Sequence, residues 1–296
     1  MLETKELMPV NFKYKARIFE MLYSDKTELL DLYNAVNGTA YDNPEELEIN
    51  TLENAIYMAM HNDVSFVIDT MLSLYEHQST YSPNLPLRYL FYISDLYSKI
   101  TKDENLYGEK MIKIPTPRFI IFYNGEEKRP EKEILKLSSM YLNEDNKPSL
   151  ELEALFLNIN PGYNENLKSL CKSLSDYAEY TSRVRRYAKE MEIKEAVEKA
   201  ITECIQEGIL AHFLSEHRAE AKKVSIYEYD QEKHLRMERE DAEAAGIAKG
   251  IVKGRNELLE ELVKKKLQKN KSPEVIAEEL EEDISTIQNI ISLIEQ

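Results

Sequence analysis

Two carboxylates and an amide fall close together in one stretch of the chain, residues 62–88. Asp63 opens the segment VSFVI, and Glu76 and Gln78 lie at the end of the segment LSLYEHQ. Carboxylate and amide oxygens suit a hard divalent cation such as Mg²⁺, which binds few protein groups and keeps several waters. A cation held there can polarise a phosphodiester and lower the pKa of the attacking water. These residue types therefore indicate metal-assisted phosphodiester hydrolysis.

The two segments must be paired β-strands for these groups to converge. Side chains alternate across a strand, so Glu76 and Gln78 project from the same face as the leucines that precede them. This face of the strand is apolar at two successive positions and then polar, which indicates that the end of the strand extends beyond the core. Pairing of the two strands would bring Asp63 close to Glu76. The same pattern also describes a hairpin whose polar residues end a strand in water, because short motifs recur by chance.

Six stretches of the chain are similar in sequence to segments of a known family: NDVSF, LYEHQST, PNLPLRYLFYISDLY, IPTPRFIIFYNG, LELEALFLNIN and ECIQEGILAHFLSEHRAE. They resemble the bacterial recombination-promoting nucleases, the Rpn family of the PD-(D/E)xK nuclease superfamily. The resemblance runs from about residue 12 to about residue 254. It implies a DNA endonuclease linked to recombination or transposition, with Mg²⁺ or Mn²⁺ bound by Asp63 and Glu76. It also implies that Gln78 is a third catalytic residue, where the wider superfamily has lysine.

One position departs from that family. Its members usually carry an acidic residue in a D-x-x-F pattern on the helix flanking the site, whereas the matching segment KARIF has Ala16 there. Glu20 follows one helical turn later and is a candidate substitute acid. The departure keeps an alternative open, namely a catalytically impaired nuclease-fold protein that binds DNA or a partner protein.

Basic and aromatic side chains near this stretch are candidate contacts for a DNA phosphate. Arg88 begins the helical segment after Gln78, and Arg118 and Tyr123 lie in the run TPRFIIFY. Because Gln78 is uncharged, it cannot supply the positive charge of lysine or act as a base, so the two arginines gain importance. Each of these residues can equally be an ordinary surface residue. The net charge of −16 argues against a simple nucleic-acid binder. It does not exclude a nuclease, because substrate binding by a nuclease depends on the local electrostatic field at its cleft.

The elements that must position these groups alternate between helix and strand in the first half of the chain. Helical spacing predicts two helices between residues 11 and 37, with a break at Asp25 and a C-cap at Gly38. A loop and a helix follow Gln78, and TPRFIIFY and LELEALFLNIN predict buried strands. This alternation predicts an α/β domain with a mixed sheet. The resemblance sharpens it to the restriction-endonuclease-like fold, a mixed sheet flanked by helices.

The second half is predicted to be helical, which gives a nuclease-like core over residues 1–165, a helical extension over 166–255 and a helical hairpin over 256–296. Glycines at four-residue intervals in AGIAKGIVKGRNE predict a flexible or weakly helical linker before the hairpin. Ser272 and Pro273 mark the start of the hairpin. Its outline also fits a helix-turn-helix DNA reader, but the last helix is almost free of lysine and arginine. Charge therefore favours a docking or homo-oligomerisation role.

Composition bounds the remaining possibilities. The first residues mix charged and apolar side chains, unlike a signal peptide, and no apolar run is long enough to cross a bilayer. Cys171 and Cys204 lie far apart and fit no metal-ligand spacing, which favours two reduced thiols. We therefore expect a cytoplasmic protein without membrane contact.

Overall fold

The segments that carry Glu76 and Gln78 form a hairpin in the computed structural model, which describes residues 18–49, 64–144 and 147–294. Strand β2 (Val64–Ile68) pairs antiparallel with β3 (Met71–Gln78), and Val64 stands opposite Tyr75. A two-residue turn joins them, and its first residue, Asp69, has a φ of 53°. Asp tolerates this left-handed conformation better than most residues, so the local sequence favours the tight turn. The predicted strand pair is confirmed.

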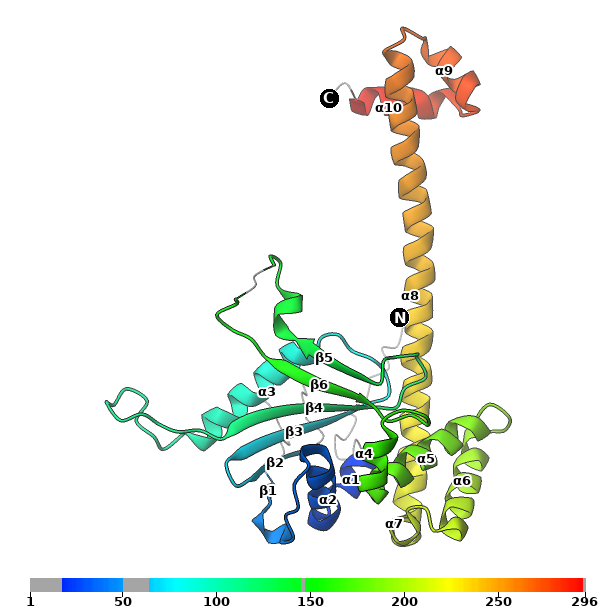
Figure 1. Cartoon of the computed structure of the whole chain (residues 1–296). Helices are drawn as coiled ribbons and strands as arrows, with labels where there is room; N and C mark the ends of the chain where they lie inside the picture. Colours follow the sequence, from blue (N-terminus) through cyan, green and yellow to red (C-terminus); the bar gives the residue numbers. More distant parts are fainter. Residues whose placement is uncertain (1–17, 50–63, 145–146, 295–296) are drawn as a thin grey trace, which may run out of the picture. The chain divides into compact units, whose positions relative to one another are not determined.

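The hairpin belongs to a six-stranded sheet with the order β1-β2-β3-β4-β6-β5 (Figure 1). The other strands are β1 (Glu48–Ile49), β4 (Thr116–Tyr123), β5 (Lys132–Lys136) and β6 (Glu153–Asn158). β3, β4 and β6 are parallel, whereas the other pairings are antiparallel. The predicted α/β class with a mixed sheet is confirmed. Because parallel strands share a direction, the carboxyl ends of β3, β4 and β6 meet at one edge.

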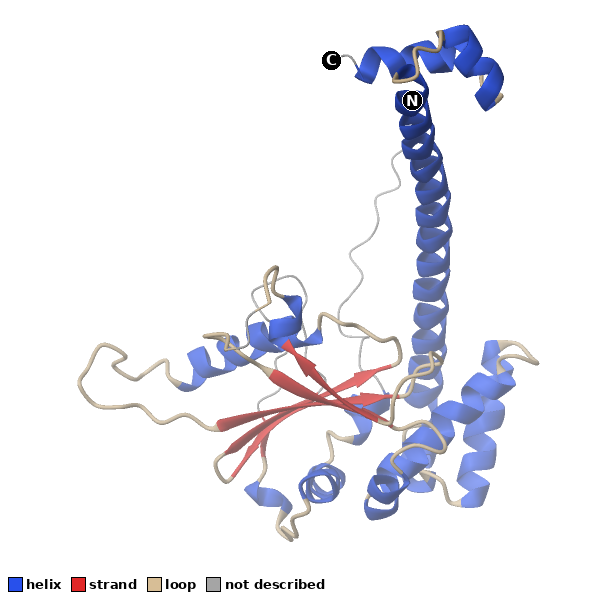
Figure 2. Ribbon diagram, turned by 45° about the horizontal axis from the view of Figure 1, so that its top comes forward, coloured by secondary structure: helices blue, strands red, loops and turns tan. Residues whose placement is uncertain are grey.

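Helices cover both faces of this sheet (Figure 2). α3 (Leu85–Ile100) packs Tyr89, Tyr92 and Leu96 on the face that carries Leu72 and Leu74. The opposite face receives α1 (Ile18–Leu22) and α2 (Lys26–Asn37), together with helices from later in the chain. The side-chain alternation of β3 thus feeds two separate cores, one on each face.

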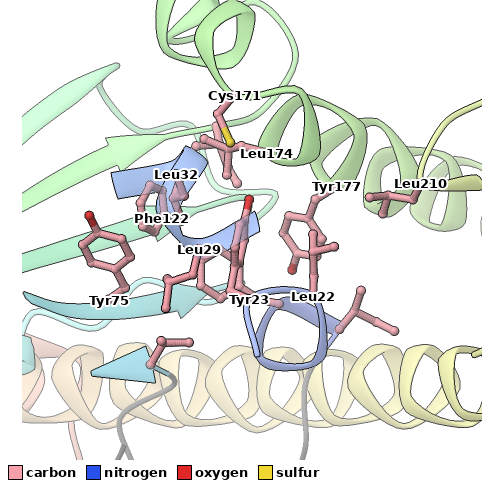
Figure 3. Packing of buried hydrophobic residues seen from close by; sticks show 14 of the residues in the cluster. Leu22, Tyr23, Leu29, Leu32, Tyr75, Phe122, Cys171, Leu174, Tyr177 and Leu210 are labelled. Atoms are coloured by element: carbon pink, nitrogen blue, oxygen red, sulfur yellow. The ribbon is translucent and has the colours of Figure 1, made fainter. Parts of the chain in front are cut away.

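The core opposite α3 is rich in aromatic side chains. Figure 3 shows Tyr75 and Phe122 from the sheet near Leu29 of α2 and near Leu174 and Tyr177 of α5. Helix α2 begins where the break was predicted, because the Asp25 side chain accepts hydrogen bonds from the backbone N–H groups of the two residues that follow Lys26. It ends at Gly38, whose φ of 66° completes the predicted C-cap.

The chain beyond residue 164 is helical, as predicted. α4 (Glu165–Leu170), α5 (Lys172–Tyr187), α6 (Ile193–Glu207) and α7 (Ala211–Glu216) precede the 50-residue helix α8 (Arg218–Leu267). Short 3₁₀ turns form earlier in the chain at Pro44–Glu46 and Leu137–Met140. The chain forms two compact units, residues 1–232 and 233–296. The functional boundaries near residues 165 and 255 stay predictions.

The expectation of a weakly helical linker around Gly246, Gly250 and Gly254 is wrong, because all three lie inside α8. Each glycine costs about 1 kcal/mol of helix stability relative to alanine. The neighbouring alanine, lysine and glutamate residues are strong helix formers, and ion pairs such as Lys253–Glu257 add support along the helix.

The second unit closes with the predicted pair of helices, α9 (Pro273–Leu280) and α10 (Ile284–Ile294). Ser272 is the N-cap residue of α9. Its core joins α8 to both helices through the side chains of Leu259, Val263, Ile276, Ala277, Ile287 and Ile290. Among the described residues, no helix is both long and apolar enough to cross a membrane.

Candidate active site

Glu76 and Gln78 lie side by side at the carboxyl end of β3. Gln78 Nε2 donates a hydrogen bond to Glu76 Oε1 at 3.0 Å. Glu76 is only 1% exposed and Gln78 7% exposed, and both share the face of Leu72 and Leu74. A carboxylate buried this deeply in its charged form requires charge-assisted partners. Nearby cations therefore decide what this site can do.

Arg88 supplies the cation. Its Nη2 atom donates to Glu76 Oε1 at 2.7 Å, and Nη2 and Nε contact the hydroxyl of Tyr92 at 2.8 and 3.2 Å. Helix α3 begins at Leu85 with Pro86 in its first turn. Arg88 and Tyr92 are four residues apart on this helix, so they lie one turn apart on the same side. Burial would lower the pKa of Arg88, but the charge of Glu76 and the contact with Tyr92 outweigh burial and raise that pKa. The structure thus brings three predicted residues together: Glu76, Gln78 and Arg88.

Two other predicted phosphate contacts are not at this place. Arg118 is paired in register with Ser73, so its exposed side chain projects from the face opposite Glu76. Tyr123 is the register partner of Gln78, but its side chain is fully buried and its hydroxyl donates to the Glu127 carbonyl at 3.0 Å. Burial, with the nearby Glu127 charge, raises the pKa of Tyr123 to about 12. Neither side chain reaches the Glu76 carboxylate, and Tyr123 is closed to a phosphate.

The remaining predicted residues belong to the N-terminal side of the hairpin. Asp63 and Ala16 lie outside the described residues. Glu20 lies on α1, the helix that packs on the face opposite Glu76 and Gln78. Its neighbour Phe19 stacks on the ring of His77, with ring centroids 5.6 Å apart. Glu20 therefore belongs to a helix on the opposite face of the sheet from Glu76.

His77 begins a polar network that the sequence analysis missed. Its Nε2 atom lies 2.8 Å from Asn124 Oδ1 and 2.9 Å from the hydroxyl of Tyr177. Arg185 of α5 also donates to Asn124 Oδ1, at 3.2 Å, and to the Asn124 carbonyl. Asn124 Oδ1 is thus the acceptor, so His77 Nε2 carries a hydrogen and donates it. Strand alternation alone places His77 opposite Glu76, but nothing in the sequence pairs it with positions 124, 177 and 185.

The network fixes the strand that carries the candidate catalytic residues. Asn124 follows Tyr123, and its backbone N–H donates to the Gln78 carbonyl at 3.1 Å. Gly125 comes next, where an added Cβ would overlap the carbonyl oxygen of Ser79. The ends of β3 and β4 are therefore held together by backbone contact. On the face opposite Glu76, Tyr177 and Arg185 of α5 contact both strand ends.

The described part of the site offers a limited set of cation ligands. Within residues 18–49, 64–144 and 147–294, no group of three or more His, Cys, Asp and Glu side chains is arranged to hold a metal ion. One carboxylate and one amide oxygen still suit Mg²⁺, which takes one or two carboxylates and keeps several waters. The donor chemistry of Glu76 and Gln78 therefore fits a hard cation, with a second carboxylate required from elsewhere. Comparison with family models, with curated proteins and with solved structures found no match to the chain.

Proposed function

We propose that this protein is a divalent-metal-dependent DNA endonuclease with a restriction-endonuclease-like core, acting in the cytoplasm in recombination or transposition. The observation that carries the proposal is the placement of Glu76 and Gln78, buried side by side at the end of β3 with Arg88 against them. A solvated strand end, the bland interpretation of the same residues, would leave them exposed. The hairpin, the crossover helix α3 and the parallel strand β4 support the fold assignment.

The register of the hairpin supports Asp63 as the second carboxylate. Val64 stands opposite Tyr75 in the last described pair of β2 and β3. Asp63 precedes Val64 and Glu76 follows Tyr75, so one more antiparallel pair would set the two carboxylates opposite each other. Side chains directly opposite in such a pair have Cβ atoms about 5 Å apart, close enough to share a cation.

Each residue has a distinct role in this proposal. Asp63 and Glu76 would hold Mg²⁺ or Mn²⁺, which would polarise the phosphodiester and lower the pKa of the attacking water. Gln78 orients the attacking water or contacts the phosphate, since its amide can donate or accept but cannot take up a proton. Arg88 provides the positive charge that the amide lacks.

The second candidate function is a nuclease-fold protein that binds DNA or a protein without cutting. Ala16 in place of the family's acid and the net charge of −16 motivate it. In that case the site would bind little metal, and the helical C-terminal region would carry the interaction, including any contact between copies of the chain.

Plasmid cleavage in Mg²⁺ or Mn²⁺ tests the proposal. The wild-type chain is compared with Asp63→Ala, Glu76→Ala and Ala16→Asp, and with Glu133→Ala as a control on the outer strand β5. We expect cleavage by the wild type and by Glu133→Ala and none by Asp63→Ala or Glu76→Ala. Cleavage by Ala16→Asp alone would mean that the site is real but disarmed. Unchanged cleavage by Asp63→Ala would contradict the assignment, and no cleavage by any variant would favour the binding protein.

A further inference from the structure

Arg88 bridges two buried side chains, Glu76 and Tyr92, and is itself more exposed than either. Its guanidinium contacts Glu76 on the sheet and Tyr92 on its own helix, and the same Nη2 atom serves both. The Arg88 side chain is 31% exposed, whereas the Glu76 side chain is 2% exposed. The arginine can therefore turn toward solvent while the carboxylate stays in place.

The contact with Glu76 conflicts with cation binding. Oε1 accepts from both Arg88 and Gln78. A divalent cation bound to that oxygen would meet a guanidinium that stays protonated at any ordinary pH and repels it. The Tyr92 hydroxyl carries no such conflict, and it already accepts from Arg88 Nε at 3.2 Å.

We propose that Arg88 is an exchangeable counter-ion of Glu76. In the cation-free protein it neutralises the buried carboxylate and fixes its orientation. When a divalent cation binds, Arg88 gives up Glu76, keeps Tyr92 and presents its guanidinium to a phosphate of the nucleic acid. This inference rests on the proposed function, because it takes Glu76 as a metal ligand. It makes Arg88 a positioning residue before the cation arrives and a phosphate ligand afterwards.

The fold permits this exchange without moving a helix. Arg88 and Tyr92 are one turn apart on α3, so a rotation of the arginine side chain alone separates the guanidinium from β3. Arg129 provides a matched comparison, because it is also 31% exposed and ion-paired, to Glu127 at 2.6 Å. Its partner is not a proposed metal ligand.

The test is Mg²⁺ titration of the full-length protein without DNA, followed by calorimetry and by NMR of the arginine Nε–H groups. Glu76→Gln identifies the heat that belongs to the site. We expect Arg88→Gln to lower the Mg²⁺ dissociation constant about tenfold, equivalent to about 1.4 kcal/mol, and Arg129→Gln to leave it unchanged. In the wild type, the Arg88 Nε–H signal, assigned by its absence from Arg88→Gln, should shift with Mg²⁺ while that of Arg129 stays.

The outcomes separate this inference from the proposed nuclease. If Glu76→Gln abolishes Mg²⁺ binding but the Arg88 signal does not move, the exchange is overturned and the metal site stands. Equal or weaker Mg²⁺ binding by Arg88→Gln has the same meaning. An absence of Mg²⁺ binding in both the wild type and Arg88→Gln would overturn the exchange and the metal-dependent function together. If Arg88→Gln does not fold, the signal shift in the wild type, assigned through Arg88→Lys, decides.

Discussion

His77 and Asn124 join the ends of two parallel strands through a side-chain hydrogen bond of 2.8 Å. They project from the face opposite Glu76, so the edge that carries the candidate catalytic residues is fixed from behind. Phe19, Tyr177 and Arg185 complete the surroundings of this pair. A buried polar pair of this kind adds stability only while every partner is present.

We expect His77→Ala to lower the free energy of unfolding of the first unit by about 2–4 kcal/mol, because it leaves a cavity and strips partners from Asn124 and Tyr177. Urea unfolding followed by near-ultraviolet circular dichroism measures the change. His212→Ala is the control, since that histidine side chain is 91% exposed and its loss should alter the free energy by less than about 0.5 kcal/mol. Equal effects of the two substitutions would contradict the importance of the network.

Two glycines should respond in opposite directions to substitution by alanine. At Gly125 the new Cβ would overlap the Ser79 carbonyl oxygen, a backbone atom that cannot turn aside. We expect Gly125→Ala to destabilise the protein by about 1–3 kcal/mol. Gly246 lies in α8 with nothing near its added Cβ, so Gly246→Ala should stabilise the helix by about 0.5–1 kcal/mol. Thermal unfolding of the two variants beside the wild type measures both signs, and a stabilised Gly125→Ala would refute the close approach.

Glu279 should make the second unit sensitive to acid. Hydrogen bonds from Lys266 and Lys271 lower the pKa of Glu279 from its ordinary 4.5 to about 2. A lowered pKa means that these contacts stabilise the fold above the unfolded pKa, and that this stabilisation is lost as the pH falls from about 4.5 to about 2. We expect Glu279→Gln to lower the unfolding midpoint at neutral pH, with the difference from wild type disappearing as the pH approaches 2. Glu278→Gln, at the neighbouring exposed carboxylate, is the control substitution; a difference for Glu279→Gln that does not change with pH would contradict the ion pairs.

The two cysteines should be inert in the folded protein. Both are free and fully buried, in agreement with the prediction of reduced thiols. Burial raises the pKa of Cys204 to about 11 and also raises that of Cys171. Since the thiolate is the reactive form, a thiol reagent near neutral pH should label neither cysteine until the chain is unfolded. Rapid labelling of either one in the native protein would show that its surroundings open.

The sequence predicts the elements whose local signals agree with their surroundings. The hairpin follows from alternation on both sides of Asp69, and α2 follows from the cap residues Asp25 and Gly38. Strand β5 was missed because KEILK is short and mostly charged, and it becomes a strand only by pairing with β6. Helix α8 was misjudged at its glycines because propensity is a weak guide within a long helix.

In the candidate site, too, the sequence predicts the local relationships between residues but not the long-range ones. Glu76 and Gln78 share a face because they are two residues apart on a strand, which sequence alone can show. Their contact with Arg88 was expected only as nearness in sequence, and the geometry depends on how α3 lies on the sheet. Arg118 shows the opposite case. Its strand β4 is adjacent to the strand of Glu76, but Arg118 is in register with Ser73, so its side chain projects from the other face of the sheet. The long-range pairing of His77 with Asn124 and Arg185 has no local signal at all.

The parallel pairing of β3 with β4 also sets an order of events during synthesis. The β2–β3 hairpin needs only neighbouring residues, so it can close within microseconds once it is made. The same strand acquires its parallel partner only after α3 and β4 have emerged, and its rear support only after Arg185 of α5 has followed. Such distant contacts carry a larger loop-closure cost and form late. A nascent chain that ends before α5 therefore displays Glu76 and Gln78 on an unsupported strand, and the complete candidate site arises only when most of the first unit has left the ribosome.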